Sequence, residues 1–359
     1  MTATLATPFC PLPFFSLRLT SEGFVYLCCF HKDEEPLGNL LEQSLDEIWN
    51  SAQIKSVRKD TVDGKLHRIC QSAGGCPYKC TDNKPAPMPE NLRLRKLEIG
   101  LPNTHCNIGG KTPTVEHPAC IMCERSLPGY RFEQDRLPEI LHKIKPMMPG
   151  MEVLHIQGVA EPFWQDAIFK VLEALDYEKY QNQTLLTTCT NGTVLGAEKR
   201  KRYLSIAPRS NLSLSIDAAT ATTYEKIRRL PNVFHRVIEN AIAYGHERNP
   251  KTQIFQIQHN INTLNVHEVV DMVRIAKEAN CDTLEFNPTG GHPPEILVNA
   301  HNSHLFQKAE DEIRNAAEKY GQKVVILRPL IYNSTLNTLH ISSRLRGVLR
   351  AIRNRVSGM

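Results

Sequence analysis

The sequence predicts an α/β protein in which a sheet of successive βα units follows a small cysteine-rich module. Two observations lead to this fold class. From residue 96 onwards, short apolar runs typical of buried strands alternate with amphipathic stretches typical of helices, which is the pattern of a parallel sheet with helical crossovers. Ahead of these units, six of the eleven cysteines lie within the first 80 residues. A compact metal-binding module before the sheet is therefore expected.

Six strands are expected in the sheet, each a short run rich in apolar side chains and followed by a helical pattern. They are residues 97–101, 153–157, 184–188, 212–216, 254–258 and 283–287. Residues 324–327 add either a seventh strand or a pairing at the sheet edge.

The first ninety residues carry the signals of a hairpin followed by a helix. Two β-rich runs, 14–19 and 24–27, flank a turn at Gly23. A helix is expected after Ser44, because Glu47 stands three residues on as its capping-box partner. The expected boundaries are 1–82 for the cysteine-rich module, 83–95 for a proline-rich linker, 96–330 for the sheet domain and 331–359 for a C-terminal tail. The tail alternates arginines with apolar residues over 342–359, which predicts a basic amphipathic helix.

Composition limits the class of protein. The chain has 359 residues, of which 41% are hydrophobic and 23% charged, as in ordinary soluble globular proteins. No apolar run reaches the length of a membrane span, and the start lacks the pattern of a signal peptide, so we expect a cytoplasmic location. Cysteines in that compartment indicate metal ligands rather than disulfides. The net charge of +5 permits a nucleic-acid partner but does not argue for one.

Three cysteines follow the first strand of the sheet domain: Cys106, Cys120 and Cys123. Three thiolates on a four-iron cluster leave one iron open to another ligand, whereas a fourth ligand would close a structural zinc or iron–sulfur site. A zinc site is the alternative for this loop.

The segment C-N-I followed by C-I-M-C resembles the cluster loop of the radical S-adenosylmethionine (radical SAM) enzymes, whose usual spacing is C-x3-C-x2-C. Here thirteen residues separate Cys106 from Cys120. The resemblance implies a 4Fe-4S cluster held by Cys106, Cys120 and Cys123, with the open iron chelating S-adenosylmethionine (SAM). It also implies a partial (β/α)6 TIM-type barrel as the fold of the sheet domain.

The N-terminal module resembles the SPASM or twitch domain that binds an auxiliary cluster in many radical SAM enzymes. Its spacings G-x4-C and C-x5-C-x3-C match those of that domain, and His67 stands where a further cysteine would be. Structural zinc is the alternative. The ligands implied for one auxiliary 4Fe-4S cluster are Cys10, Cys28, Cys70 and Cys76, with Cys80 as the competitor for a place.

Residues past the ends of the barrel strands complete the resemblance. The segment G-V-A-E-P containing Glu161 is similar to the family's G-G-E-P, T-N-G contains Asn191, and S-x-D supplies Ser215 and Asp217 ahead of Y-x-x-I-R, which ends in Arg228. These five residues are implied to bind or support SAM. In α/β barrels the catalytic and binding residues lie just past the carboxyl ends of the strands.

Cys189, at the end of the third barrel strand, has two interpretations. It either returns a hydrogen atom to a substrate radical, as a cysteine does in radical SAM peptide epimerases, or packs as a small apolar residue. The resemblance implies reductive cleavage of SAM to a 5′-deoxyadenosyl radical that abstracts a substrate hydrogen. The implied substrate is a peptide, modified by oxidation, crosslinking or epimerisation, and the reductant is flavodoxin or ferredoxin. The alternatives are a sugar or small-metabolite substrate, and a non-enzymatic zinc or iron–sulfur module.

Overall fold

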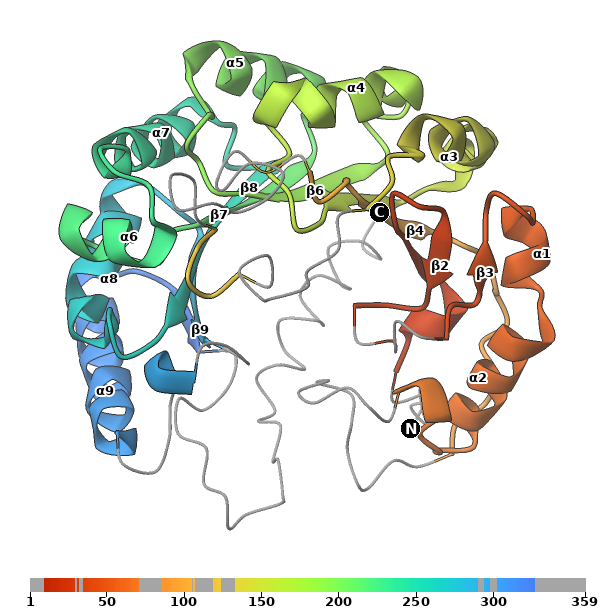
Figure 1. Cartoon of the computed structure of the whole chain (residues 1–359), viewed down its shortest axis with the longest axis horizontal. Coiled ribbons are helices and arrows are strands. Elements are labelled where there is room, and N and C mark those ends of the chain that lie inside the picture. Colours follow the sequence, from red (N-terminus) through yellow and green to blue (C-terminus); the bar gives the residue numbers. More distant parts are fainter. Residues whose placement is uncertain are drawn as a thin grey trace, which may run out of the picture.

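The described part of the chain folds around one ten-stranded sheet with helices along its outer side (Figure 1). This computed structural model describes residues 10–29, 31, 35–70, 85–104, 106, 119–123, 133–289, 294–297 and 302–326. The strand order is β10-β9-β8-β7-β6-β5-β4-β1-β2-β3. From β4 to β10 the order follows the chain and neighbouring strands pair in parallel, which confirms the predicted α/β fold class.

The elements alternate as the sequence predicts. The barrel strands are β4 (Lys96–Gly100), β5 (Val153–Gln157), β6 (Leu185–Thr190), β7 (Ser210–Ser215), β8 (Gln253–Ile261), β9 (Thr283–Pro288) and β10 (Val324–Ile326). The α-helices between them are α3 (Leu137–Ile144), α4 (Ala167–Ala174), α5 (Ala197–Ile206), α6 (Ala221–Arg228), α7 (Phe234–Glu247), α8 (Val269–Glu278) and α9 (Ser303–Tyr320). Short 3-10 turns cover Leu12–Phe14, Arg68–Cys70, Lys145–Gly150, Trp164–Asp166, Tyr177–Lys179, Val266–Glu268 and Pro294–Ile296.

All six predicted strands are present, with ends that agree to within three residues, and the seventh is β10, which pairs in parallel with β9. The predicted basic helix at 342–359 lies outside the described residues. None of the helices in the described segments is both long and apolar enough to cross a membrane.

The N-terminal module continues the barrel sheet. Its strands are β1 (Ser16–Leu19), β2 (Phe24–Tyr26) and β3 (Gly38–Asn39), and its helices are α1 (Leu45–Trp49) and α2 (Ala52–Val62). β1 and β2 form the predicted antiparallel hairpin, and β1 pairs in parallel with β4. The predicted capping box of α1 is confirmed, since the Ser44 hydroxyl accepts from the Glu47 amide and the Glu47 carboxylate accepts from the Ser44 amide. Module and barrel therefore share one sheet.

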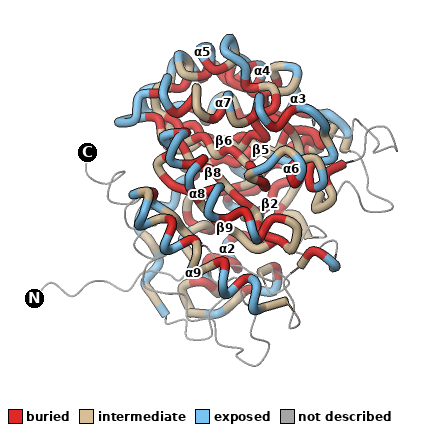
Figure 2. The backbone as a smooth tube through the Cα atoms, turned by 90° about the vertical axis from the view of Figure 1, so that its left-hand side faces the viewer, coloured by how far each residue is buried: buried red, intermediate tan, exposed pale blue. Residues whose placement is uncertain are grey.

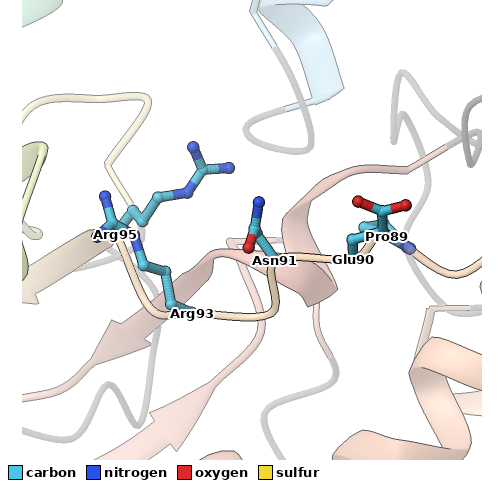
Figure 3. Close-up of a pocket in the computed structure, with 5 residues that line it drawn as sticks. All are labelled: Pro89, Glu90, Asn91, Arg93 and Arg95. Atoms are coloured by element: carbon cyan, nitrogen blue, oxygen red, sulfur yellow. The ribbon is translucent and has the colours of Figure 1, made fainter.

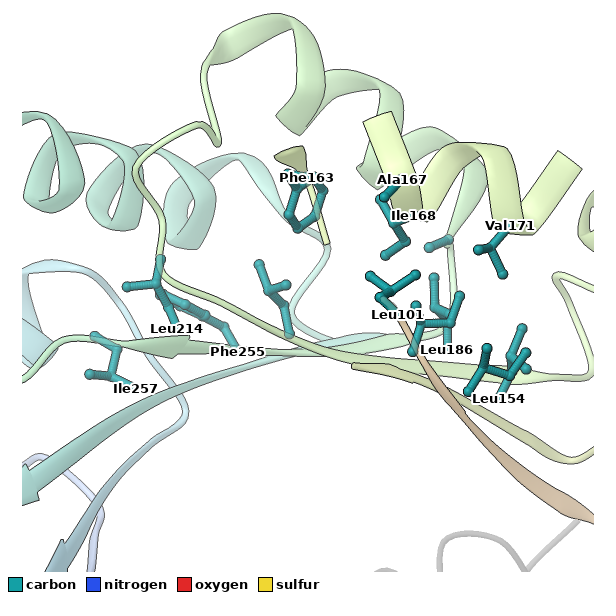
Figure 4. Close-up of a cluster of buried hydrophobic side chains, with 14 of the residues drawn as sticks. Leu101, Leu154, Phe163, Ala167, Ile168, Val171, Leu186, Leu214, Phe255 and Ile257 are labelled. Carbon is teal, nitrogen blue, oxygen red and sulfur yellow. The ribbon is translucent and has the colours of Figure 1, made fainter. Parts of the chain in front are cut away.

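The outer face of the sheet is apolar and forms the core with the helices. Figure 4 shows Leu154, Leu186 and Leu214 on three neighbouring strands, with Ile168 and Val171 of α4 above the sheet. All five side chains are at most 2% exposed. Burial of each contributes about 1.5–3 kcal/mol relative to exposure. In Figure 2 the strands are largely buried, and exposed stretches follow the outer sides of the helices.

The opposite, inner face of the sheet is polar. Along β5, β6, β7 and β8 a half-exposed residue alternates with a buried one, and the buried set faces the helices. A closed barrel fills its interior with branched apolar side chains, so a polar, half-exposed interior marks this face as a surface for binding. We define the inner face by Glu98, His155, Gln157, Thr187, Cys189, Ser213, Ser215, Gln256, Gln258 and Glu285.

Candidate functional site

The loop that carries Cys120 and Cys123 is fixed to the end of α6. The Ile121 amide donates to the Ile227 carbonyl across 3.0 Å, and the Cys120 thiol donates to the Arg228 carbonyl across 3.7 Å. The Cys123 amide donates to the Cys120 carbonyl across 3.0 Å, which closes a tight turn between the two cysteines. Cys120 is buried and Cys123 is half-buried. The turn therefore presents both cysteines at the carboxyl-terminal edge of the sheet.

Arg228 joins this loop to the end of β7. Its Nη2 donates to the Ser215 hydroxyl across 2.7 Å and forms an ion pair with Asp217, whose side chain is fully buried. Its Nη1 lies 4.0 Å from the Cys120 sulfur. Burial acts to lower the pKa of Arg228, but the charge of Asp217, with smaller contributions from neighbouring groups, outweighs it, so the pKa is raised. Three of the predicted SAM-site residues and one predicted cluster ligand thus form one connected group.

Asp217 is held from a second side by Asn260 in β8 and by Asn265, which follows that strand. Its Oδ1 accepts from the Asn260 backbone amide across 2.8 Å and from the Asn260 side chain across 3.1 Å. The Asn265 side chain donates to the Asp217 carbonyl across 2.8 Å. A fully buried carboxylate needs such partners, so Asp217 fixes the ends of β7 and β8 relative to Arg228.

Glu161 joins the ends of β5 and β6. One carboxylate oxygen accepts from the Thr190 hydroxyl across 2.6 Å and from the Phe163 amide across 3.1 Å, and the other accepts from the Asn191 amide across 2.7 Å. The side chain is 1% exposed. Burial raises the pKa of Glu161, although the three hydrogen bonds act to lower it. In this structure Glu161 positions the T-N-G turn, and its predicted contact with SAM stays a prediction.

Gly158 lets the end of β5 approach the end of β4. A Cβ at this position would lie 2.8 Å from the carbonyl oxygen and 3.1 Å from the amide nitrogen of Leu101, and its φ is +154°. The glycine of the predicted G-x-x-E-P segment is therefore required by backbone contact.

Cys189 lies on the inner face. Its thiol donates to the Gln258 side-chain oxygen across 3.7 Å. Burial, with a smaller contribution from the charge of Glu161, raises the pKa of Cys189 to about 12. The thiol therefore keeps its hydrogen near neutral pH. The structure thus places the thiol on the inner face beside Gln258, and its role as a hydrogen donor stays a prediction.

The inner face also holds two acidic residues that the sequence analysis did not single out, Glu98 and Glu285. The Gln157 amide and Arg18 Nε lie 3.2 Å and 3.3 Å from one Glu98 oxygen. On the far strands, Gln256 and Gln258 donate to Glu285. The alternation of polar and apolar residues along these strands was the signal in the sequence that could have revealed a polar face. Strands of a parallel sheet covered on both faces are nearly continuously apolar, whereas β8 carries glutamine at alternate positions.

The predicted cluster ligands are only partly placed. Cys106, Cys120 and Cys123, like Cys10, Cys28 and Cys70, belong to the described residues, whereas Cys76 and Cys80 lie outside them. Within the described segments no three cysteine, histidine or acidic side chains are grouped closely enough to hold a metal ion. The ligand sets therefore stay predictions.

A pocket opens at the other end of the sheet (Figure 3). It is lined by Pro89, Glu90, Asn91, Arg93 and Arg95, which immediately precede β4. Arg93 and Arg95 lie 2.8 Å and 3.5 Å from the Glu152 carboxylate, so their charges are already partly balanced. Because the cysteine loop follows the carboxyl end of β4, this pocket is separate from the candidate site.

Comparisons with known proteins identify the N-terminal module. Residues 10–77 match the SPASM family, an iron–sulfur cluster-binding domain. This match confirms the predicted SPASM module and the expectation of an iron–sulfur cofactor. Among curated proteins there is no match.

Solved structures resemble the chain remotely. Streptococcus suis SuiB bound to S-adenosylmethionine is 12% identical over 64% of this chain and 50% of its own, with a TM-score of 0.45. SuiB bound to the precursor peptide SuiA is also 12% identical, over 88% of this chain and 71% of its own, with a TM-score of 0.46. The protein anSMEcpe with bound AdoMet is 17% identical over 65% of this chain and 61% of its own, with a TM-score of 0.48. The chain thus spans about half of the first structure and about three fifths of the last.

Proposed function

We propose that this chain, whose residues 10–77 match the SPASM domain, is a radical SAM enzyme that abstracts a hydrogen atom from its substrate. The observation that carries the proposal is the connected group at the carboxyl end of the sheet, in which Arg228 contacts Cys120, Ser215 and Asp217. Cysteine suits an iron–sulfur cluster, and a polar group beside it suits the charged and hydroxyl groups of SAM.

Each residue of the group has a proposed task. Cys106, Cys120 and Cys123 would hold a 4Fe-4S cluster, and Ser215, a half-exposed hydroxyl on the inner face, would bind SAM directly. Asp217 and Arg228 would orient that hydroxyl, and Glu161 would hold Asn191 at the edge of the cofactor site. When bound, the cluster supplies the electron that cleaves the sulfonium of SAM. An auxiliary 4Fe-4S cluster would occupy the SPASM module, held by Cys10, Cys28, Cys70 and Cys76, with Cys80 as the competitor for one of these places.

We propose a peptide as the substrate and its oxidation, crosslinking or epimerisation as the reaction. The inner face supports this choice, because its amide side chains both donate and accept hydrogen bonds, as peptide groups require. Cys189 would return a hydrogen atom to the substrate from its protonated thiol. Flavodoxin or ferredoxin in the cytoplasm would supply electrons. A sugar or small metabolite is the other substrate class that a polar face of this kind could bind.

Anaerobic reconstitution with iron and sulfide, followed by metal counting and an assay for reductive SAM cleavage, tests the proposal. We expect about eight irons per chain and 5′-deoxyadenosine from the wild type. The variant Cys120→Ala/Cys123→Ala should keep the auxiliary iron, about four per chain, and form no 5′-deoxyadenosine. Bound zinc, or iron without SAM cleavage in the wild type, would make the chain a non-enzymatic metal-binding module instead.

A further inference from the structure

The inner face carries two carboxylates in different electrostatic settings. Glu98 lies 3.3 Å from Arg18 Nε and is thereby neutralised within the protein. Within the described segments Glu285 accepts only from neutral amides: Gln256 Nε2 lies 3.4 Å from one of its oxygens and Gln258 Nε2 lies 3.3 Å from the other. Among the described residues, no lysine, arginine or histidine forms an ion pair with Glu285.

The surroundings of Glu285 explain why it matters that no described residue supplies a counter-ion. The side chain is half-buried, and burial raises its pKa even though Gln258 donates to it. A charge removed from water is unfavourable unless an opposite charge meets it. The two amides fix the carboxylate in one orientation and leave each oxygen able to accept a further hydrogen bond. A carboxylate held in this way can bind a cation without reorienting.

The position of Glu285 places that cation beside the proposed chemistry. Gln258 contacts both Glu285 and the thiol of Cys189, so a single side chain separates the carboxylate from the proposed hydrogen donor. Ser213 extends the same network through Gln256, to which it donates across 3.3 Å. The network spans β6, β7, β8 and β9 on the inner face.

We propose that Glu285, held by Gln256 and Gln258, binds an ammonium or guanidinium group of the substrate. The inference rests on the proposed function, because it places a basic group of the substrate next to Cys189, the proposed hydrogen donor. The cation belongs either to a lysine or arginine side chain of a peptide or to a small free amine. SAM is also cationic, but the residues proposed for it are at the ends of β5 to β7, where Arg228 already balances Asp217.

Titration calorimetry on the reconstituted full-length protein tests the inference without requiring turnover. The probes are acetyl-glycyl-lysyl-glycinamide, the same peptide with norleucine in place of lysine, n-butylamine, and SAM. We expect the wild type to bind the lysine peptide roughly tenfold more tightly than the norleucine peptide, which corresponds to one charge-assisted hydrogen bond. In Glu285→Gln this preference should fall to within about twofold, with SAM affinity unchanged.

Glu318→Gln is the matched control, because it removes the same charge from an exposed position on α9 and should keep the lysine preference. Competition by n-butylamine at similar concentration would identify a free amine as the source of the cation, and its failure would identify the peptide. The inference is overturned if binding of the lysine peptide to the wild type is too weak to measure, or if it is no tighter than binding of the norleucine peptide. It is also overturned if Glu285→Gln keeps the preference or loses SAM affinity. Absence of SAM cleavage in the wild type would reject the proposed function alone.

Discussion

The thiol of Cys120 donates a hydrogen bond to the backbone carbonyl of Arg228 across 3.7 Å, although 108 residues separate the two in sequence. The side chain of the same arginine pairs with Asp217 and donates to Ser215. A shift at the end of α6 would therefore move the cysteine turn and the end of β7 together. This contact couples the proposed cluster loop to the proposed SAM site.

Removing the Arg228 guanidinium should be strongly destabilising. Asp217 is fully buried, and Arg228→Gln would leave its charge without a counter-ion. We expect the free energy of unfolding to fall by about 3–5 kcal/mol, as for other broken buried ion pairs. Anaerobic denaturant unfolding measures this loss.

The control for Arg228 is its neighbour. Arg229→Gln removes the same charge from an exposed position and should change the free energy of unfolding by no more than about 0.5 kcal/mol. Equal effects of the two variants would show that the ion pair with Asp217 does not stabilise the fold.

Glu161→Gln should change how stability depends on pH. Burial raises the pKa of Glu161 in the folded state. Its stabilising contribution is thus fully present below the unfolded-state pKa and declines as pH rises through the folded-state pKa. Because glutamine does not titrate, the wild-type advantage over Glu161→Gln should shrink as the pH rises above the unfolded-state pKa of a glutamate, about 4.3. Unfolding curves at several pH values test this, and an advantage that grows with pH would contradict it.

Much of the fold could be predicted because its signals are local. Each barrel strand is a short apolar run before a helical pattern, and Ser44 with Glu47 defines a helix start within four residues. Pairing of β1 with β4 could not be predicted in this way, because the register depends on contacts between segments about 80 residues apart.

The sequence predicted individual residues of the candidate site but not the contacts between them. Ser215, Asp217 and Arg228 were predicted from the resemblance of their motifs to those of radical SAM enzymes, but the ion pair of Arg228 with Asp217 and the contact with Cys120 depend on tertiary packing. Glu285 was missed because the strand at 283–287 was predicted from its apolar residues, and a single glutamate among them carries no functional signal. Its partners Gln256 and Gln258 lie on another strand, so only the assembled inner face shows that Glu285 has no counter-ion among the described residues.

Gly158→Ala should disturb the junction of β4 and β5. The added Cβ would lie 2.8 Å from the Leu101 carbonyl oxygen, which belongs to the backbone and cannot turn aside. We expect a loss of about 1–3 kcal/mol in the free energy of unfolding. Gly150→Ala is the control, because no atom lies within 4 Å of its Cβ position, and it should be neutral to within about 0.5 kcal/mol. Thermal unfolding of both variants measures the two losses. Equal stability of Gly158→Ala and Gly150→Ala would show that β4 and β5 can move apart at this junction with little loss of free energy.

The Cys189 thiol should resist alkylation in the folded protein. Its pKa is raised to about 12 from an ordinary value of 9.0, so at pH 8 its thiolate fraction is about a thousandfold below that of an unfolded cysteine. Since thiolate is the reactive form, iodoacetamide should label Cys189 at least about a thousandfold more slowly in the folded protein than in urea. Site-resolved mass spectrometry measures both rates. Gln258→Leu removes the hydrogen-bond acceptor of the thiol and leaves burial in place, so labelling should stay slow in that variant. Rapid labelling of the folded wild type would show a thiolate at Cys189 and argue against its proposed role as a hydrogen-atom donor.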